Sequence, residues 1–184
     1  MIVALWLLAI LGIIGAFDTF YYHEWRARLP AQGPAAAPEL GIHAARDFFY
    51  AIIFLSLPLI EWRGWWALAF AAVLVIEIVL TMWDFVIEIV VRKPLGDVYA
   101  GERITHNFMG IIYGAMIAFL VPILWEWGQM PSELVGSTYG APAPLIGFLL
   151  LAGAGVFLSG VRDFYAALQL PNCNWPWPKH DSSN

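Results

Sequence analysis

Long apolar stretches alternate with short polar segments along the whole chain. Each stretch approaches the roughly 20 residues that an α-helix needs to cross the hydrocarbon core of a bilayer. They predict membrane-spanning helices at about residues 2–22, 43–61, 65–90, 104–125 and 143–165. We therefore expect an all-α integral membrane protein, an antiparallel bundle of five transmembrane helices that forms one membrane domain over residues 1–184.

The composition supports a membrane protein and excludes several other classes. Hydrophobic residues make up 61% of the chain and charged residues only 12%, which rules out an ordinary soluble domain. The single cysteine, Cys173, excludes a disulfide within one chain. No basic run or stripe is present, so we expect no nucleic-acid partner. The first apolar stretch has no preceding lysine or arginine and no A-x-A pattern, which favours a retained span over a cleaved signal peptide.

Basic residues predict how the bundle is oriented. Five crossings place the termini on opposite sides, and Arg63 is alone on one side of such a bundle. The other basic residues are Arg26, Arg28, Arg46, Arg92, Lys93, Arg103, Arg162 and Lys179. Because cytoplasmic loops are enriched in lysine and arginine, the N-terminus is predicted outside, and the C-terminus and the tail at 166–184 in the cytoplasm.

Ionisable residues gather at the predicted cytoplasmic ends of the helices. Such groups are costly in lipid unless they are paired, metal-bound or hydrated. Positions three, four and seven apart share a helix face, and this spacing aligns histidines with carboxylates on facing helices. The candidate metal ligands are His43, Asp47, Asp84, Glu88, Glu102 and His106, with Asp18, His23 and Glu24 as secondary candidates.

The candidate ligands are carboxylates and imidazoles, which suit iron, manganese or zinc better than copper(I). Helix bundles hold pairs of iron or manganese ions with similar groups, often through a Glu-x-x-His pair. Here Glu102 and His106 are separated by one residue more, so the likeness is chemical. The sequence predicts a mononuclear or dinuclear centre.

Three polar residues lie deeper than the outermost of these ligands: Tyr50 and Tyr113 are level with Asp18 and Asp84, roughly one turn further in, and Glu77 is deeper still. Glu77 lies about 11 residues, or roughly 16 Å, from the cytoplasmic end of its helix. Tyr50 and Tyr113 lie on neighbouring helices, and with Glu77 they are candidates for a second layer around a metal or for a proton path. Gly110 and Gly114 form a Gly-x-x-x-Gly pattern that is typical of close helix packing.

The pattern leaves several functions open. The leading hypothesis is a metal-dependent membrane oxidoreductase that oxidises a lipid-soluble substrate such as a lipid or quinone; bound zinc would instead favour hydrolysis. A second hypothesis is a haem- or pigment-binding subunit with His43 and His106 as axial ligands. In a third, arginines neutralise the carboxylates in an ionic girdle, and the chain is an accessory subunit of a larger membrane complex or a homo-oligomer. A metal-free polar pocket or proton path is a fourth.

Four segments carry a resemblance to known sequences. They are YYHEWRARLP at 21–30, ELGIHAARDFFYA at 39–51, WDFVIE at 83–88 and ERITHNFMGIIYGAM at 102–116. The first two thirds of the chain resembles an uncharacterised family of bacterial five-span inner-membrane proteins. The resemblance implies a bacterial inner (cytoplasmic) membrane and five spans, and it brings no activity with it.

Overall fold

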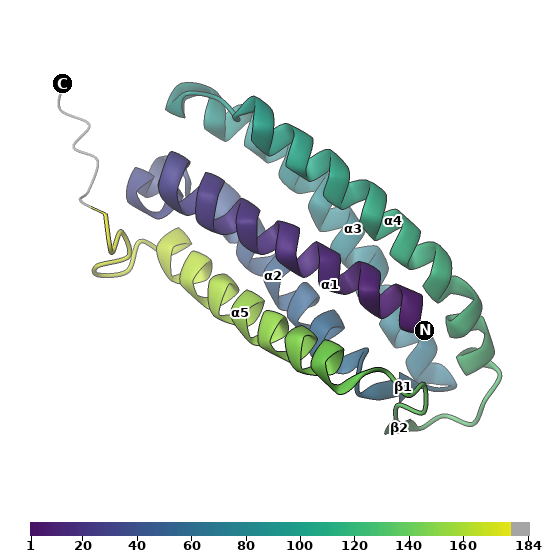
Figure 1. The fold of residues 1–184 in the computed structure, drawn as a ribbon. Coiled ribbons are helices and arrows are strands. Elements are labelled where there is room, and N and C mark those ends of the chain that lie inside the picture. Colours follow the sequence, from purple (N-terminus) through teal and green to yellow (C-terminus); the bar gives the residue numbers. More distant parts are fainter. Residues whose placement is uncertain (178–184) are drawn as a thin grey trace.

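Five long helices account for most of residues 1–177, the part of the chain that the computed structural model describes (Figure 1). The elements in chain order are α1 (Ile2–Phe17), the π-helix η1 (Asp18–Ala27), the 3₁₀-helix η2 (Leu29–Ala35), α2 (Ala37–Ser56), β1 (Ile60–Trp62), α3 (Trp65–Arg92), the 3₁₀-helix η3 (Lys93–Leu95), α4 (Ala100–Gly128), β2 (Leu134–Gly136) and α5 (Ala143–Ala167). The predicted tail at 166–184 lies partly outside the described residues, as does Lys179.

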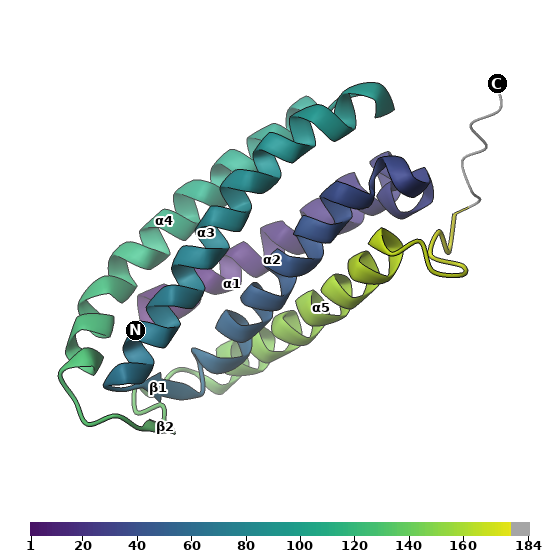
Figure 2. The same ribbon diagram turned by 180° about the vertical axis from the view of Figure 1, so that it is seen from behind.

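The long helices run up and down, so the N-terminus and the end of α5 lie at opposite ends of the bundle (Figures 1 and 2). α2 packs against α5 and α3, and α1 packs against α4 and α5. Four helical segments are long and apolar enough to cross a membrane: Ile2–Ala27, Trp65–Leu95, Ala100–Gly128 and Ala143–Ala167. α2 is 20 residues long, but it contains three charged residues, Glu39, Arg46 and Asp47, and is not among the four.

The second predicted span, at 43–61, was wrong in its limits. Its helix begins at Ala37, because Pro38 lies in the first turn, where a missing N–H costs nothing. The helix ends at Ser56, since Pro58 has no N–H to continue the hydrogen-bond ladder. Residues 60–62 form a strand instead. α2 therefore begins and ends earlier in the sequence than predicted, and it includes more polar residues at its N-terminal end.

A short antiparallel strand pair closes the end of the bundle near the N-terminus. Ile60 of β1 pairs with Gly136 of β2, which joins the α2–α3 connection to the long α4–α5 loop. Glu61 Oε1 accepts hydrogen bonds from the backbone N–H and the hydroxyl of Thr138, at 2.9 and 2.6 Å. Arg63 donates to Glu61 Oε2 at 2.7 Å. Burial raises the pKa of Glu61, but these donors outweigh it and hold the pKa below its usual value.

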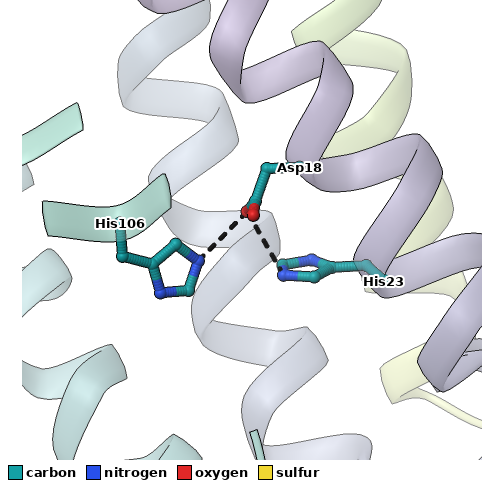
Figure 3. Close-up of side chains that lie close together, drawn as sticks. All are labelled: Asp18, His23 and His106. Atoms are coloured by element: carbon teal, nitrogen blue, oxygen red, sulfur yellow. Dashed lines mark hydrogen bonds and ion pairs between the residues drawn. The ribbon is translucent and has the colours of Figure 1, made fainter. Parts of the chain in front are cut away.

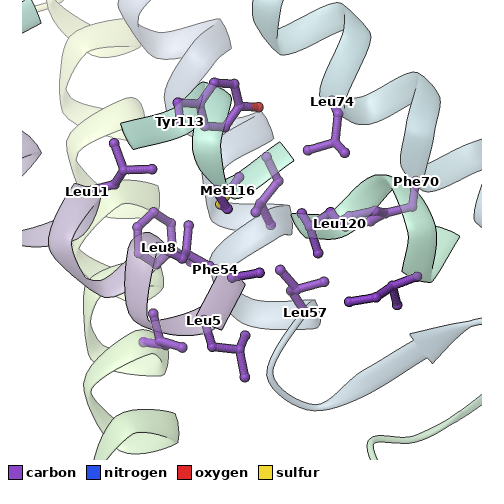
Figure 4. Packing of buried hydrophobic residues seen from close by; sticks show 14 of the residues in the cluster. Leu5, Leu8, Leu11, Phe54, Leu57, Phe70, Leu74, Tyr113, Met116 and Leu120 are labelled. Atoms are coloured by element: carbon purple, nitrogen blue, oxygen red, sulfur yellow. The ribbon is translucent and has the colours of Figure 1, made fainter. Parts of the chain in front are cut away.

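The interior of the bundle is apolar in one half and polar in the other. Leu8, Phe54, Phe70, Leu120 and Leu149 are fully buried in the half that adjoins the strands, and Figure 4 shows this packing. Further along the same helices the buried side chains are charged: Asp18, Glu39, His43, Asp84, Glu88, Arg92 and Glu102. Large apolar side chains cover the outside of the bundle along both halves. The polar interior is therefore enclosed by an apolar outer surface.

Small residues bring α2 and α5 into close contact. A Cβ at Gly153 would lie 2.8 Å from the Leu55 side chain, and one at Gly160 would lie 2.9 Å from Asp47 Cβ. The expected close packing at Gly110 and Gly114 was wrong, since a Cβ at either position would meet no described atom within 4 Å. These two glycines leave open space beside α4.

We expect Glu61→Gln to lower the thermal midpoint of unfolding at pH 7, because the carboxylate accepts hydrogen bonds from Thr138 and Arg63. The pKa of Glu61 is lower in the folded protein than in the unfolded chain, where glutamate titrates at about 4.3. Its carboxylate therefore stabilises the fold fully above that pH, and this stabilisation is lost as the pH falls through the folded-state pKa. The difference between wild type and variant should therefore shrink below about pH 4. Thermal unfolding in detergent between pH 3 and 7 measures this. Glu133→Gln, at an exposed partner of Arg63, is the control; an equal loss in both variants would contradict the assignment.

Candidate metal site

The π-helix η1 brings Asp18 and His23 onto one face. Positions five apart point about 140° away from each other in an α-helix with 3.6 residues per turn. In a π-helix the hydrogen bonds join residues five apart, so these positions lie one above the other. Asp18 Oδ2 and His23 Nε2 are 3.5 Å apart as a result. Stretches of π-helix are rare and are often found at functional sites.

His106, near the start of α4, completes a group of three side chains with Asp18 and His23. Its Nε2 lies 3.1 Å from Asp18 Oδ2, the same oxygen that faces His23. Figure 3 shows the Asp18 carboxylate between the two imidazole rings. One ligand atom from each residue lies within 4.8 Å of the other two, so the group could hold a metal ion.

A second group of potential ligands shares His106. It consists of Glu88 at the end of α3, Glu102 in the first turn of α4, and His106 one turn further on. His106 Nδ1 is 3.8 Å from Glu88 Oε2, and His23 Nε2 is 3.3 Å from Glu102 Oε1. The two groups therefore form one continuous cluster with room for one or two ions.

The spacing of these atoms fits ligands around a metal ion. Metal–ligand bonds of about 2.1 Å at a tetrahedral angle separate neighbouring ligand atoms by about 3.4 Å. The separations of 3.1 Å between Asp18 and His106 and 3.5 Å between Asp18 and His23 bracket that value. Among residues 1–177, buried His23 Nε2, Asp18 Oδ1 and Glu88 Oε1 have no hydrogen-bond partner. Buried polar atoms are nearly always satisfied, so these ligand atoms are available to a bound ion.

Two arginines, the buried Arg92 and the partly buried Arg46, neutralise other carboxylates beside the cluster. Arg92 donates to Glu102 Oε1 at 2.5 Å, and its Nε lies 3.7 Å from Glu39. The Arg46 guanidinium donates a hydrogen bond to the Asp84 carboxylate. These pairs account for part of the buried negative charge.

His43 links the cluster to the Arg46–Asp84 pair. Its ring stacks on His23 with the ring centres 4.6 Å apart and the planes within 7° of parallel. His43 Nε2 lies 3.2 Å from Asp84 and Nδ1 lies 3.9 Å from Asp163, so carboxylates face both nitrogens. These contacts fit a role for His43 in orienting His23 better than a role as a metal ligand.

The structure separates the predicted ligands into three sets. Glu88, Glu102 and His106 gather in the cluster with the secondary candidates Asp18 and His23. His43 and Asp84 lie next to it, engaged by His23, Arg46 and Asp163. The other two candidates lie elsewhere: Asp47 packs against Gly160 of α5, and Glu24 pairs with Arg162 at 2.8 Å.

Glu39 and Arg92 belong to this region but were not among the candidate metal ligands. Glu39 is fully buried, and neither of its carboxylate oxygens has a hydrogen-bond partner within the described part of the chain. Its position four residues before His43 was a usable signal, since the two share a helix face. Arg92 looked like an ordinary basic helix end, and only the packing of α3 against α2 and α4 shows that it is buried.

The proposed ionic girdle forms only in part. Four of the five arginines at this level pair with carboxylates: Arg162 with Glu24, Arg92 with Glu102, Arg46 with Asp84, and Arg103 with the exposed Asp97. Arg26 instead lies over the ring of Tyr99. Within residues 1–177, neither Asp18 nor Glu88 has an arginine or lysine within 4 Å, and both face histidines. Arginine pairing therefore leaves the two carboxylates at the centre of the cluster uncompensated.

No family model, curated protein or solved structure matches this chain. The resemblance to bacterial five-span membrane proteins thus stays a prediction from the four sequence segments that carry it.

Arg92→Gln should destabilise the protein strongly, because Glu39 and Glu102 would remain buried without their cation. Removing one partner of a buried ion pair typically costs about 3–5 kcal/mol. Arg103→Gln is the matched control at the same end of the bundle, since both Arg103 and Asp97 are more than half exposed and such pairs contribute about 0–1 kcal/mol. Unfolding by sodium dodecyl sulfate in mixed micelles compares them, and equal losses would show that burial of Arg92 is unimportant.

Proposed function

We propose that this protein is an integral membrane metalloprotein that binds iron, manganese or zinc at Asp18, His23, Glu88, Glu102 and His106, and that it oxidises a lipid-soluble substrate. The observation that carries the proposal is the convergence of three elements, η1, α3 and α4, on one buried group of carboxylates and imidazoles. The chain forms one domain in a bacterial inner membrane.

α2 is the fifth crossing in this proposal. It lies between α5 and α3 and runs antiparallel to both (Figure 2). Its charges do not face lipid, because Glu39 and His43 are buried and Arg46 is paired with Asp84. Charged groups that face the interior of a bundle are compatible with a transmembrane helix.

In the proposed orientation, the N-terminus lies outside and the metal site lies near the cytoplasmic surface. Eight of the nine basic residues belong to the end of the bundle that carries the site or to the tail, which is the distribution of a cytoplasmic side.

Cysteine labelling tests this orientation. With Cys173 replaced by serine, an Arg28→Cys variant should react with a membrane-impermeant maleimide only after the cells are opened. A Ser137→Cys variant, in the loop after β2, should react in cells with permeable outer membranes. Labelling of both positions from the outside would overturn the five-crossing arrangement.

The balance of charge favours a bound cation over an empty cluster. Apart from Glu77, which lies deeper in α3, five buried carboxylates, Asp18, Glu39, Asp84, Glu88 and Glu102, face two arginines, Arg46 and Arg92, which leaves three negative charges when all five are ionised. Protonating all three histidines would compensate them, but it would stack two like-charged rings, His23 and His43, at 4.6 Å. A divalent ion supplies two positive charges and leaves His23 neutral, the form in which imidazole binds metals.

The metal chemistry follows from the type of ligand. Carboxylate and imidazole ligands suit iron, manganese and zinc, and iron or manganese in such a site supplies electron transfer between an organic substrate and dioxygen. His106 also lines a cavity between α3 and α4, so a molecule there would touch a metal ligand. We therefore favour oxidation over zinc-dependent hydrolysis.

Haem is less compatible with these contacts than a metal ion. A haem held by His43 and His106 would need its porphyrin plane between the two rings, but His43 is covered by His23 on one face and both its nitrogens face carboxylates. The accessory-subunit hypothesis differs in a measurable way, because it predicts a metal-free protein.

Metal content tests the proposal. Wild-type protein purified in mild detergent without chelator should contain one or two iron, manganese or zinc ions per chain by mass spectrometry. His106→Ala and Asp18→Asn should each reduce occupancy about tenfold or more at limiting metal, because they remove ligands. Glu24→Gln, which alters an ion pair at the same end of the bundle, should retain the metal. A folded, metal-free wild type would favour an accessory subunit.

A further inference from the structure

A cavity of about 230 Å³ lies between α3 and α4, beside the proposed metal site. α2 contributes its inner wall through Arg46 and Tyr50. The outer rim includes exposed Met82 of α3 and the exposed Gly110 and Gly114 of α4. Because this surface of the helices faces lipid in a membrane-spanning bundle, the cavity opens sideways into the bilayer.

The two glycines keep the cavity open. A Cβ at Gly110 or Gly114 would meet no atom of the described residues within 4 Å, so neither glycine is needed for helix contact. Glycine in a helix interior costs about 1 kcal/mol relative to alanine. A cavity that admits a ligand accounts for both positions.

The inner wall carries polar atoms with unused hydrogen-bonding capacity. Glu77 is fully buried, and Thr81 donates to its Oε1 at 2.5 Å. The other oxygen, Oε2, has no partner among residues 1–177, and the same is true of Tyr113 Oη and Arg46 Nε. A glutamate oxygen, a phenol and a guanidinium N–H offer both acceptors and donors to one bound molecule.

The size and lining of the cavity favour an aromatic ring. An apolar cavity of about 150 Å³ is large enough for benzene, so 230 Å³ accommodates one substituted ring. Phe85 and Tyr113 supply aromatic surfaces, and the thioethers of Met82 and Met109 adapt to irregular shapes. An apolar tail on such a ring would pass between Met82 and the glycines into the lipid.

We propose that this cavity binds the ring of a hydroquinone-type lipid, with a ring hydroxyl on Glu77, a ring oxygen on Tyr113 or Arg46, and the tail in the bilayer. This inference rests on the proposed function, because it identifies the class of lipid-soluble substrate that is oxidised there. Each hydroquinone would lose two electrons and two protons to become a quinone, and dioxygen, the oxidant named in the proposed function, would take them up to form hydrogen peroxide, or two molecules of water from two hydroquinones. His106 lines the cavity and belongs to the metal cluster, so the bound ring lies next to the proposed redox centre.

Leucine at Gly110 or Gly114 would add a bulky side chain at the lining of the cavity, and its Cβ would meet no described atom within 4 Å. Gly155 of α5 is the matched control, because it is also exposed and a Cβ there meets no described atom within 4 Å. The probe is decylubiquinol, and its dimethyl ether, which has no hydroxyl donor, is the control ligand. Binding is measured by thermal stabilisation in detergent, and metal content is determined on the same samples.

Wild type and Gly155→Leu should bind decylubiquinol equally, whereas Gly110→Leu, Gly114→Leu and Tyr113→Phe should bind it about tenfold more weakly or worse. The dimethyl ether should bind weakly to all of them. Equal binding to Gly110→Leu, Gly114→Leu and Gly155→Leu, or equal binding of the ether to wild type, would overturn the assignment. A metal-loaded wild type that does not bind the probe refutes only this inference; a metal-free wild type that binds it refutes the proposed metal chemistry instead.

Discussion

The cost of burying charge inside a membrane bundle governs the arrangement of this protein. One half of the interior contains five buried carboxylates, and the outside of the same helices is apolar. In such surroundings an uncompensated carboxylate is very unfavourable, so each must have a cation, a proton or a hydrogen-bond donor. Arg46 and Arg92 supply two of these cations. In the described part of the chain, Asp18 and Glu88 have histidines and no arginine as neighbours, so these two carboxylates still require positive charge.

The other half of the bundle makes this arrangement possible by fixing the helices. Three features fix the helix ends that lie far from the site: the tight packing of α2 on α5 at Gly153, the apolar cluster around Phe54 and Phe70, and the β1–β2 pair. The polar half can then keep its ligands at fixed separations. Functional sites are held most precisely when rigid helices or strands support them in this way.

The helices and the polar end of the bundle followed from the sequence, because hydropathy and helix periodicity are strong signals. Glu88, Glu102 and His106 were found because an α-helical period aligns them. Asp18 and His23 were only secondary candidates. The α-helical period separates positions five apart, and the π-helix that brings them together cannot be recognised from periodicity. Asp47 and Glu24 had suitable chemistry, but packing turned them to α5 and Arg162.

Anomalous diffraction at the absorption edge of the bound metal tests the central claim most directly, because it locates the ion rather than counting it. The account predicts an anomalous peak about 2.0–2.3 Å from Asp18, His23 and His106, with a second possible peak only beside Glu88 and Glu102. A cluster that contains only water or hydrogen-bonded side chains in protein loaded with iron, manganese or zinc would contradict it, as would a peak at any other place in the chain.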